Sequence, residues 1–466
     1  MSLKHYDLLV VGSGPGGQKA AITAAKLGKN VGLIERKPYL GGVSLQTGTI
    51  PSKAMREAAF LASRFSARGM RANPARQFIT HDFLSEAIAR KDHIVKQKET
   101  VLLKQLMQCG VSIIPGEASF HDAHTLAVKS PVGQIELLHA DVIILATGSR
   151  PRRPDDIPFD KERVLDSTSI LKLKHLPEQL LIVGGGVIAC EFATLFAPLG
   201  VKVIIVDSHQ QILAYLDKDI ADNLVNHMHD MDIKLHMNTR VKTIQREENG
   251  VRVETDNKEL FKVDTVLYAL GRQPNYDNLN IDRAGLVDDD NGWIKINEKH
   301  QTNVEHIYII GDLAGSPSLA STAMQQGIAI TQHAFGTEYQ PTSGPMPMAI
   351  YTIPELSYVG ETERQLIQRG ADYVTGLANY AETARGQIIG DQHGMLKLLV
   401  EKSSRQLLGV HIIGETASEL IHIGQLAMSY QSTVDKLADN VFNYPTLAEC
   451  YKTAALSCID QLEPTQ

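Results

Sequence analysis

One glycine-rich segment near the start of the chain has the composition and spacing that a bound phosphate requires. It contains Gly12, Gly14 and Gly17, and an acidic residue, Glu35, follows about twenty residues later. In such a turn one glycine makes the tight bend, one lets the backbone approach a pyrophosphate, and one lets helix and strand pack closely. The helix that follows then points free N–H groups at the phosphates. The segment therefore predicts a dinucleotide site in which Glu35 binds the adenosine ribose.

A second segment repeats the pattern with one substitution. Gly184 and Gly186 are followed by Ala189, an accepted variant of the third glycine, and Asp207 ends the next apolar run. One such motif is weak evidence, because glycine-rich turns are common. Two copies, each between apolar runs and each followed by an acid, predict two dinucleotide-binding domains in one chain.

The elements that must position these residues are βαβ units. Apolar runs at 6–11 and 31–34 flank a helical stretch at 18–27, and runs at 180–183 and 201–206 flank the second segment. Continuous apolar runs are typical of buried parallel strands. The sequence therefore predicts an α/β fold with two Rossmann-like domains.

Three further apolar runs end on glycine, at Gly148, Gly271 and Gly311, where backbone can approach a ligand closely. Asp312 follows the last of them, and residues 317–319 are expected to open a helix over 320–333. A helix N-terminus at this place favours a ligand group that carries negative charge.

Beyond residue 341 the composition changes. Pro341, Pro345 and Pro347 indicate a linker, and strand-like runs at 395–400 and 407–413 alternate with helical stretches that contain no further glycine-rich motif. This pattern predicts a C-terminal α+β domain that serves assembly. We expect four parts, at residues 1–150, 151–270, 271–341 and 342–466.

Composition excludes several classes of function. The net charge of −7 argues against a nucleic-acid partner, and the sequence contains no apolar run near the ~20 residues that a membrane span needs. The N-terminus lacks the features of a secretory signal, so we expect a cytoplasmic protein. The four cysteines are at neither CxxC nor metal-ligand spacing, so no metal site is predicted. Cys450 and Cys458, eight residues apart, are expected to lie on one face of a helix and to pack there as small apolar side chains.

Four other segments carry a family resemblance: TGTIPSK at 47–53, YTIPE at 351–355, IHIGQ at 421–425 and FNYPTLAE at 442–449. Together with the two glycine-rich motifs, they make the whole chain resemble the flavoprotein disulfide reductases, the group of glutathione reductase and lipoamide dehydrogenase. Within that group the chain is most similar to the pyridine nucleotide transhydrogenases. The resemblance implies FAD in the first domain and its central part, NAD(H) and possible NADP(H) substrates in the second, and a homodimer through the C-terminal domain.

The chain departs from the family at the residues that perform disulfide chemistry. Ser44 and Thr49 occupy the positions of the two redox cysteines, and Tyr444 occupies the position of the histidine that precedes Glu449. A hydroxyl can form neither a disulfide nor a reactive thiolate, so this site excludes dithiol chemistry of the family's kind. We expect the Tyr444–Pro445 peptide bond to be cis, because the corresponding His-Pro bond of the family often is.

The resemblance also assigns the remaining site residues. It places Lys53 beside the flavin in an ion pair with Glu191, where a cation stabilises negative charge on the reduced ring. It places Tyr444 and Glu449 at the partner subunit's site. The expected FAD contacts are Gly12, Gly14, Gly17, Glu35, Arg36, Gly42, Ser44, Thr49, Thr147, Gly148, Gly311, Asp312 and Ala320, and the expected NAD contacts are Gly184, Gly186, Ala189, Asp207 and Gly271.

The leading interpretation is a transhydrogenase that works in two steps at one pocket: a reduced nucleotide gives hydride to FAD and leaves, and an oxidised nucleotide takes it. An NAD(P)H-dependent quinone or dye reductase fits the missing cysteines equally well. A redox sensor or assembly subunit is a third possibility, against which Lys53, Glu191 and Asp312 argue. Asp207 suits the 2′-hydroxyl of NAD, and residues 208–211 contain no arginine for a 2′-phosphate, so we expect NADH to be favoured over NADPH.

Overall fold

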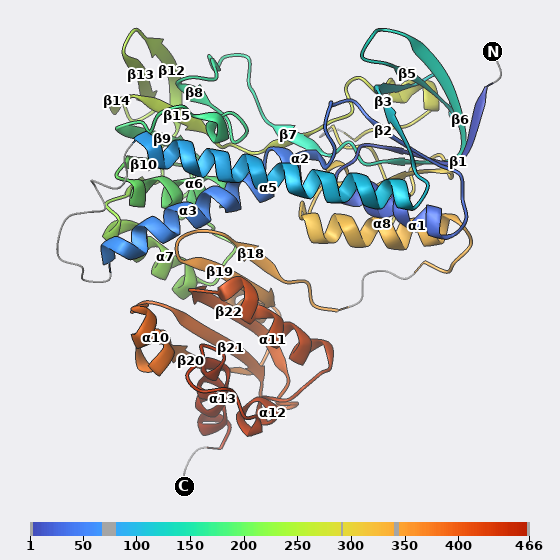
Figure 1. The fold of residues 1–466 in the computed structure, drawn as a ribbon. Helices are drawn as coiled ribbons and strands as arrows, with labels where there is room; N and C mark the ends of the chain where they lie inside the picture. The colour runs from blue at the N-terminus through green and yellow to red at the C-terminus, as the bar shows by residue number, and fades with distance from the viewer. Residues whose placement is uncertain (1–2, 68–80, 290–291, 340–343, 464–466) are drawn as a thin grey trace. The chain divides into compact units, whose positions relative to one another are not determined.

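A computed structural model describes residues 3–67, 81–289, 292–339 and 344–463 (Figure 1). The chain forms two compact units. The first consists of Met1–Ala54, Glu86–Arg153 and Gly271–Ser343, and the second of Met55–Ser85, Pro154–Leu270 and Gly344–Gln466. Of the three prolines expected in the linker, Pro341 lies outside the described residues.

The first unit is built around a seven-stranded sheet in the order β3-β2-β1-β6-β5-β4, with β17 beside β6. Its strands are β1 (Lys4–Val11), β2 (Val31–Glu35), β3 (Ser112–Pro115), β4 (Glu117–Phe120), β5 (Thr125–Lys129), β6 (Ile135–Leu145) and β17 (Ile307–Ile309). β1, β6 and β17 run parallel, and Val11 and Ile309 are both register partners of Leu145. The segments after these three strands therefore start at one edge of the sheet.

Both faces of this sheet are buried, because residues of β1 alternate between two cores. Leu8 and Val10 pack on one side, and Leu9 and Val11 on the other. The helix α1 (Pro15–Lys26) lies against α8 (Ala320–Ala334), where a Cβ on Gly327 would come within 2.3 Å of the Gly16 carbonyl oxygen. The other elements that begin or lie in this unit are α2 (Gly42–Gln46), α3 (Thr49–Ala67), β7 (Ser149–Pro151), β16 (Arg272–Pro274), η3 (Ile281–Ala284) and η4 (Gly311–Ala314).

The second unit contains a parallel sheet in the order β11-β10-β9-β15-β8. Its strands are β8 (Val164–Leu165), β9 (Gln179–Val183), β10 (Lys202–Val206), β11 (Lys234–His236) and β15 (Thr265–Tyr268). β9 leads into α6 (Val187–Phe196), and β10 leads towards α7 (Lys218–Asp230), so the second predicted βαβ unit is present. The remaining elements here are η1 (Ile170–Lys172), η2 (Ala197–Leu199) and an antiparallel sheet of β12 (Val241–Glu247), β13 (Gly250–Thr255) and β14 (Leu260–Val263). The helix α5 (His81–Gln108) runs from this unit into the first.

The C-terminal part of the second unit is an antiparallel sheet in the order β18-β19-β22-β21-β20. Its strands are β18 (Met348–Ile350), β19 (Glu355–Gly360), β20 (Tyr373–Asn379), β21 (Met395–Glu401) and β22 (Leu407–Gly414), with helices α9 (Glu363–Gln368), η5 (Tyr380–Glu382), α10 (Ala384–Ile389), α11 (Ala417–Ser429), α12 (Val434–Asp439) and α13 (Glu449–Leu462). Cys450 and Cys458 are both fully buried on α13, which confirms the packing prediction. Burial raises the pKa of each thiol to about 12, so both stay protonated at neutral pH.

A buried lysine connects the nucleotide-binding sheet of this unit to its C-terminal sheet. Lys397 on β21 has a side chain only 1% exposed, and its Nζ lies 3.2 Å from Asp217 Oδ2, 2.8 Å from Asp219 Oδ2 and 2.7 Å from Glu363 Oε2. Asp217 immediately precedes α7, and Glu363 begins α9. Burial lowers the pKa of Lys397, but hydrogen bonds to Asp219 and Glu363 more than offset it, so the pKa is raised. The lysine therefore stays charged and holds three carboxylates together.

Removing the Lys397 ammonium should destabilise the fold. In K397M three carboxylates lose their buried partner, and we expect the free energy of unfolding to fall by about 3–5 kcal/mol, measured by urea unfolding. K402M is the matched control, because Lys402 pairs with Asp372 at 2.7 Å on the surface and is 46% exposed. Its loss should stay within about 1 kcal/mol. Equal losses in the two variants would contradict the role given to Lys397.

Candidate active site

The first glycine-rich turn (residues 12–17) is fixed by close backbone contacts. Gly12 follows β1 with φ +108°, and a Cβ there would lie 2.4 Å from the carbonyl oxygen of Ala146. A Cβ on Gly17 would lie 2.0 Å from the carbonyl oxygen of Gly12. Neither position can hold a side chain without moving the backbone. These two glycines therefore make the tight bend and the close helix–strand packing that the sequence predicts.

Gly14 has a different reason to be glycine. It is the N-cap of α1, and no described heavy atom lies within 4 Å of the place where its Cβ would be. The backbone beside the start of α1 therefore faces open space, and a helix N-terminus attracts a phosphate through its free N–H groups. This geometry fits the pyrophosphate of FAD, because a phosphate can come close to the backbone only where no side chain intervenes.

Glu35 at the end of β2 is bonded to the same turn. Its Oε2 accepts from the Ser13 backbone N–H at 3.0 Å and from Ser13 Oγ at 2.6 Å, and its Oε1 accepts from Lys37 N–H at 2.9 Å. Ser13 Oγ in turn accepts from the Gly41 N–H at 3.0 Å. Sequence reasoning missed Ser13, although a hydroxyl between two glycines of the motif was a visible clue.

The segment after β2 returns to this turn. Gly42 has φ +59°, and a Cβ on it would lie 2.8 Å from the Gly14 Cα. Ser44 lies in the short helix α2, and Thr49 is the first residue of α3. Arg36 is not bonded to the turn: its guanidinium is half-exposed and lies 3.7 Å from Glu117. The structure thus brings Gly42 to the glycine-rich turn and directs Arg36 towards β4.

The other two strand ends of the first unit meet the turn at the same edge. Ala146 N–H donates to the Val11 carbonyl at 2.8 Å, which sets Thr147 and Gly148 beside Gly12. Thr147 Oγ1 donates to the Asn275 carbonyl at 2.6 Å, and Gly148 has φ +69°.

Asp312 lies in η4, directly after Gly311 (φ +68°), and its carboxylate has defined partners. Ser149 Oγ donates to its Oδ2 at 2.6 Å, and Arg272 Nε lies 3.8 Å from the same oxygen. Sequence reasoning missed both partners, because they come from β7 and β16, far away in the chain. Ala320 begins α8 soon afterwards, as the sequence predicts.

The second glycine-rich turn (residues 184–189) has the same construction. Gly184 has φ +115°, and its Cβ would lie 3.0 Å from the Ala269 carbonyl oxygen. Gly186 is the N-cap of α6, and no described heavy atom lies within 4 Å of its Cβ position, just as at Gly14. Ala189 is fully buried. Gly271 has φ +86° and belongs to the first unit, where its carbonyl accepts from Arg152 N–H at 3.2 Å.

Asp207 at the end of β10 is the counterpart of Glu35. Its Oδ2 accepts a short hydrogen bond from Gly185 N–H. Its Oδ1 accepts from the His209 N–H at 2.6 Å and also lies 2.6 Å from His209 Nδ1. The carboxylate is buried, whereas the His209 ring is 77% exposed. The sequence identified Asp207 but not His209, so it missed the group that bonds to this acid.

Glu191 on α6 binds one of the segments that carry the resemblance. Its Oε1 accepts from Tyr351 N–H at 2.9 Å, and Thr194 Oγ1 on the same helix accepts from Ile353 N–H at 3.0 Å. Arg56 holds this segment too, since its Nη2 donates to the Thr352 carbonyl at 3.1 Å. Glu191 is therefore part of a fixed backbone network within the second unit.

Lys53 lies on α3 within the first unit, whereas Glu191 belongs to the second. Their expected ion pair stays a prediction.

The residues expected at the partner subunit's site lie around the start of α13. The Tyr444–Pro445 peptide is cis, as expected, and Tyr444 is 73% exposed. Glu449 is the first residue of α13, and its buried Oε2 has no hydrogen-bond partner among the described residues. Tyr444 presents its ring at the surface, and Glu449 has an unused acceptor.

Comparison with known proteins agrees with this architecture. The family model "Pyridine nucleotide-disulphide oxidoreductase" matches residues 6–327, and the dimerisation-domain model of the same family matches residues 346–455. The chain therefore belongs to the pyridine nucleotide-disulphide oxidoreductase family, whose members are FAD-dependent enzymes that use pyridine nucleotides. Among the described residues no helix is long and apolar enough to cross a membrane.

Relatives within this family are similar over nearly their full length. The chain is 42% identical to the soluble pyridine nucleotide transhydrogenase of Mycobacterium bovis (strain BCG / Pasteur 1173P2), over 99% of this chain and 98% of the relative. It is 40% identical to that of Aliivibrio fischeri, over 98% of each chain. Among solved structures, LpdA from Mycobacterium tuberculosis superimposes with a TM-score of 0.89 at 26% identity, covering 97% of this chain and 99% of its own. The HOCl-induced flavoprotein disulfide reductase RclA from Escherichia coli superimposes with a TM-score of 0.87 at 29% identity, covering 97% and 99%.

The open space beside Gly14 and Gly186 leads to a test that separates the two sites. G14A should fold with nearly unchanged stability but retain less FAD, because the new methyl group occupies space that a phosphate needs. G186A should retain FAD and bind NADH at least about tenfold more weakly, a loss of roughly 1.4 kcal/mol. FAD content comes from absorbance and the NADH affinity from fluorescence titration.

G17A is the structural control, because its methyl group would clash with the Gly12 carbonyl. It should lower the melting temperature, which G14A should leave nearly unchanged. Normal FAD content in G14A would contradict the assignment of the first turn.

Proposed function

We propose that this protein transfers hydride between NAD(H) and NADP(H), with FAD held at the first glycine-rich turn and one nicotinamide nucleotide at a time at the second. The observation that carries the proposal is the presence of both turns, each with its middle glycine facing open space, together with hydroxyls at Ser44 and Thr49. Relatives named soluble pyridine nucleotide transhydrogenase support it at 37–42% identity. When bound, FAD supplies a ring that can accept a hydride and return it.

Each proposed site residue has a role that follows from its type. Ser44 and Thr49 cannot exchange electrons with a disulfide, so the hydride has no route to sulfur at this place. The Lys53 ammonium, in the pair with Glu191 that the resemblance implies, stabilises negative charge beside the ring. Asp312 and the start of α8 lie on the same side of the first unit as the first turn.

The kinetic test uses the FAD-loaded protein. Anaerobic mixing with NADH or NADPH should bleach the flavin absorbance, and subsequent addition of NADP⁺ or thio-NAD⁺ should restore it. Steady-state rates should give parallel double-reciprocal lines, because the two nucleotides use one site in turn. Dihydrolipoamide should leave the flavin oxidised. Converging lines would contradict the two-step scheme, recovery with quinones alone would favour a quinone reductase, and failure to bleach would favour a sensor.

His209 bears on the choice of nucleotide. Asp207 can accept a hydrogen bond from the 2′-hydroxyl of NADH, so we still expect NADH to be the better hydride donor. The hydrogen bonds that Asp207 accepts from the backbone N–H groups of Gly185 and His209 offset part of its negative charge. The protonated form of the exposed His209 ring has a second N–H, at Nε2, which can donate to a 2′-phosphate while Nδ1 faces Asp207. We propose that this arrangement lets NADPH bind, although more weakly than NADH.

H209A should therefore lower kcat/KM for NADPH by about tenfold and for NADH by much less, since one charge-assisted hydrogen bond contributes about 1.5–3 kcal/mol. H236A is the matched control, because His236 on β11 also faces a carboxylate, Glu259, at 3.2 Å. It should leave the ratio of the two kcat/KM values unchanged. An equal loss for both nucleotides in H209A would mean that His209 only holds Asp207 in place.

We also propose a homodimer formed through the C-terminal part, in which Tyr444 and Glu449 reach the partner's site. The match to a dimerisation domain supports it, as do apolar side chains exposed on and around α11 and α13: Leu426, Tyr430, Val441, Tyr444 and Leu456. The unused Glu449 oxygen is consistent with a partner group that the single chain lacks. We also propose domain boundaries at residues 150, 270 and 341. A cytoplasmic location is proposed as well, and it agrees with the four free cysteines.

L426R should shift the protein from dimer to monomer in light scattering and remove transhydrogenase activity, because a charge replaces apolar contact area. V132R is the control, since Val132 is an apolar residue of the first unit that is 82% exposed. It should remain a dimer and keep its activity. A wild-type protein that is monomeric and fully active would overturn the proposal.

A further inference from the structure

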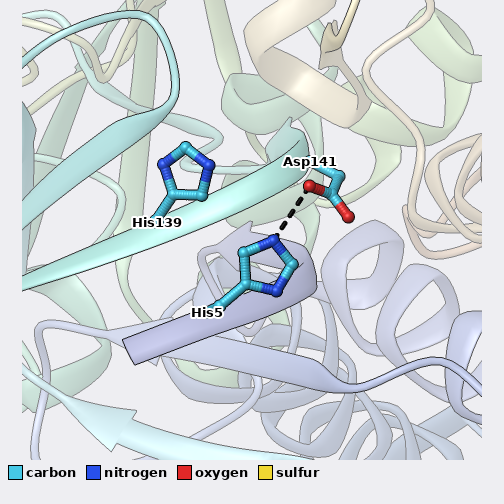
Figure 2. Close-up of side chains that lie close together, drawn as sticks. All are labelled: His5, His139 and Asp141. Atoms are coloured by element: carbon cyan, nitrogen blue, oxygen red, sulfur yellow. Dashed lines mark hydrogen bonds and ion pairs between the residues drawn. The ribbon is translucent and has the colours of Figure 1, made fainter. Parts of the chain in front are cut away.

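Three potential metal ligands lie together on neighbouring strands of the first unit, away from the first glycine-rich turn. Figure 2 shows His5 on β1 and His139 and Asp141 on β6. His5 and His139 are register partners in the parallel pair, and Asp141 lies two residues beyond His139. Side chains two apart on a strand point to the same face, so the register brings all three together.

The distances suit one ion. His5 Nε2 lies 2.9 Å from Asp141 Oδ1, and the ligand atoms of all three residues lie within 4.8 Å of one another. Ligands at about 2.0–2.1 Å from zinc lie at most roughly 4.2 Å apart. His5 and Asp141 are exposed, so small rotations of their side chains close the difference. Two imidazoles and one carboxylate are a ligand set typical of zinc and related divalent ions.

Further histidines support His139 from behind. The His139 ring lies 5.5 Å from the ring of His124, which stacks on His306 at 3.6 Å. His124 Nδ1 lies 3.0 Å from the Ala140 carbonyl oxygen, and His306 Nε2 lies 2.7 Å from that of Ala123, which holds both rings in place. Burial lowers the pKa of His306, which favours the neutral form of this ring.

We propose that His5, His139 and Asp141 bind a divalent transition metal ion, for which Zn²⁺ is the probe. The nearby ammonium of Lys4 is paired with Glu136 at 3.0 Å. The ion links β1 to β6, the strands that end at Val11 and Leu145. The site lies seven residues, about 23 Å along β1, before Gly12, so it is separate from the first turn and does not depend on the proposed hydride transfer.

The test uses untagged, FAD-loaded protein that has been treated with a chelator and dialysed. Calorimetric titration with Zn²⁺ should show one more bound ion in the wild type than in H139Q, and Zn²⁺ should raise the melting temperature of the wild type. H5Q and D141N should bind at least about tenfold more weakly, because loss of even an indirect partner of a metal costs 10–100-fold. Ca²⁺, which prefers oxygen ligands, should not reproduce these effects.

H121Q is the matched control, because His121 and Asp122 form a similar exposed pair at 3.2 Å that, among the described residues, belongs to no group of three potential ligands. It should bind Zn²⁺ as the wild type does. H5Q keeps the test decisive if H139Q is unstable, since the His5 side chain is 53% exposed and its loss should leave the fold intact. Equal Zn²⁺ stoichiometry and equal melting shifts in the wild type, H5Q and D141N would overturn the proposal.

Discussion

A carboxylate at the end of the second strand holds each glycine-rich turn in place, and the two nucleotide sites depend on this contact. Glu35 accepts from Ser13 N–H, and Asp207 accepts from Gly185 N–H, the residue after the first glycine in each case. Glycine leaves the backbone of a turn with many accessible conformations. The hydrogen bond to the carboxylate restricts each turn to one of them. It also sets the acid next to the start of a helix, where phosphate and ribose of one nucleotide can be bound together.

The two sites differ in what surrounds that carboxylate, and this difference bears on their ligands. Among the described residues Glu35 accepts from Ser13 of its own turn and from Lys37 N–H, and Ser13 extends the network to Gly41. Asp207 is bonded to His209, whose ring is open to solvent. A closed network suits a cofactor that stays bound, whereas an exposed polar ring suits a substrate that must enter and leave.

The residue types at positions 44, 49 and 444 limit the chemistry that this chain can perform there. The family resemblance places Ser44 and Thr49 at the positions of the two redox cysteines and Tyr444 at the position of the histidine. The Tyr444–Pro445 peptide is cis. Hydroxyl and phenol groups at these positions supply no sulfur that could receive electrons.

The sequence by itself determined the α/β class, both βαβ units, the C-terminal α+β part and the acids that follow each turn, because these depend on local spacing and apolar periodicity. It could not find Ser149 and Arg272 beside Asp312, since both come from other strands, and it overlooked Ser13 and His209. The cluster of His5, His139 and Asp141 shows the reason most clearly, because His5 and Asp141 are 136 residues apart along the chain. Only the register between β1 and β6 brings them together, and register is decided by tertiary packing.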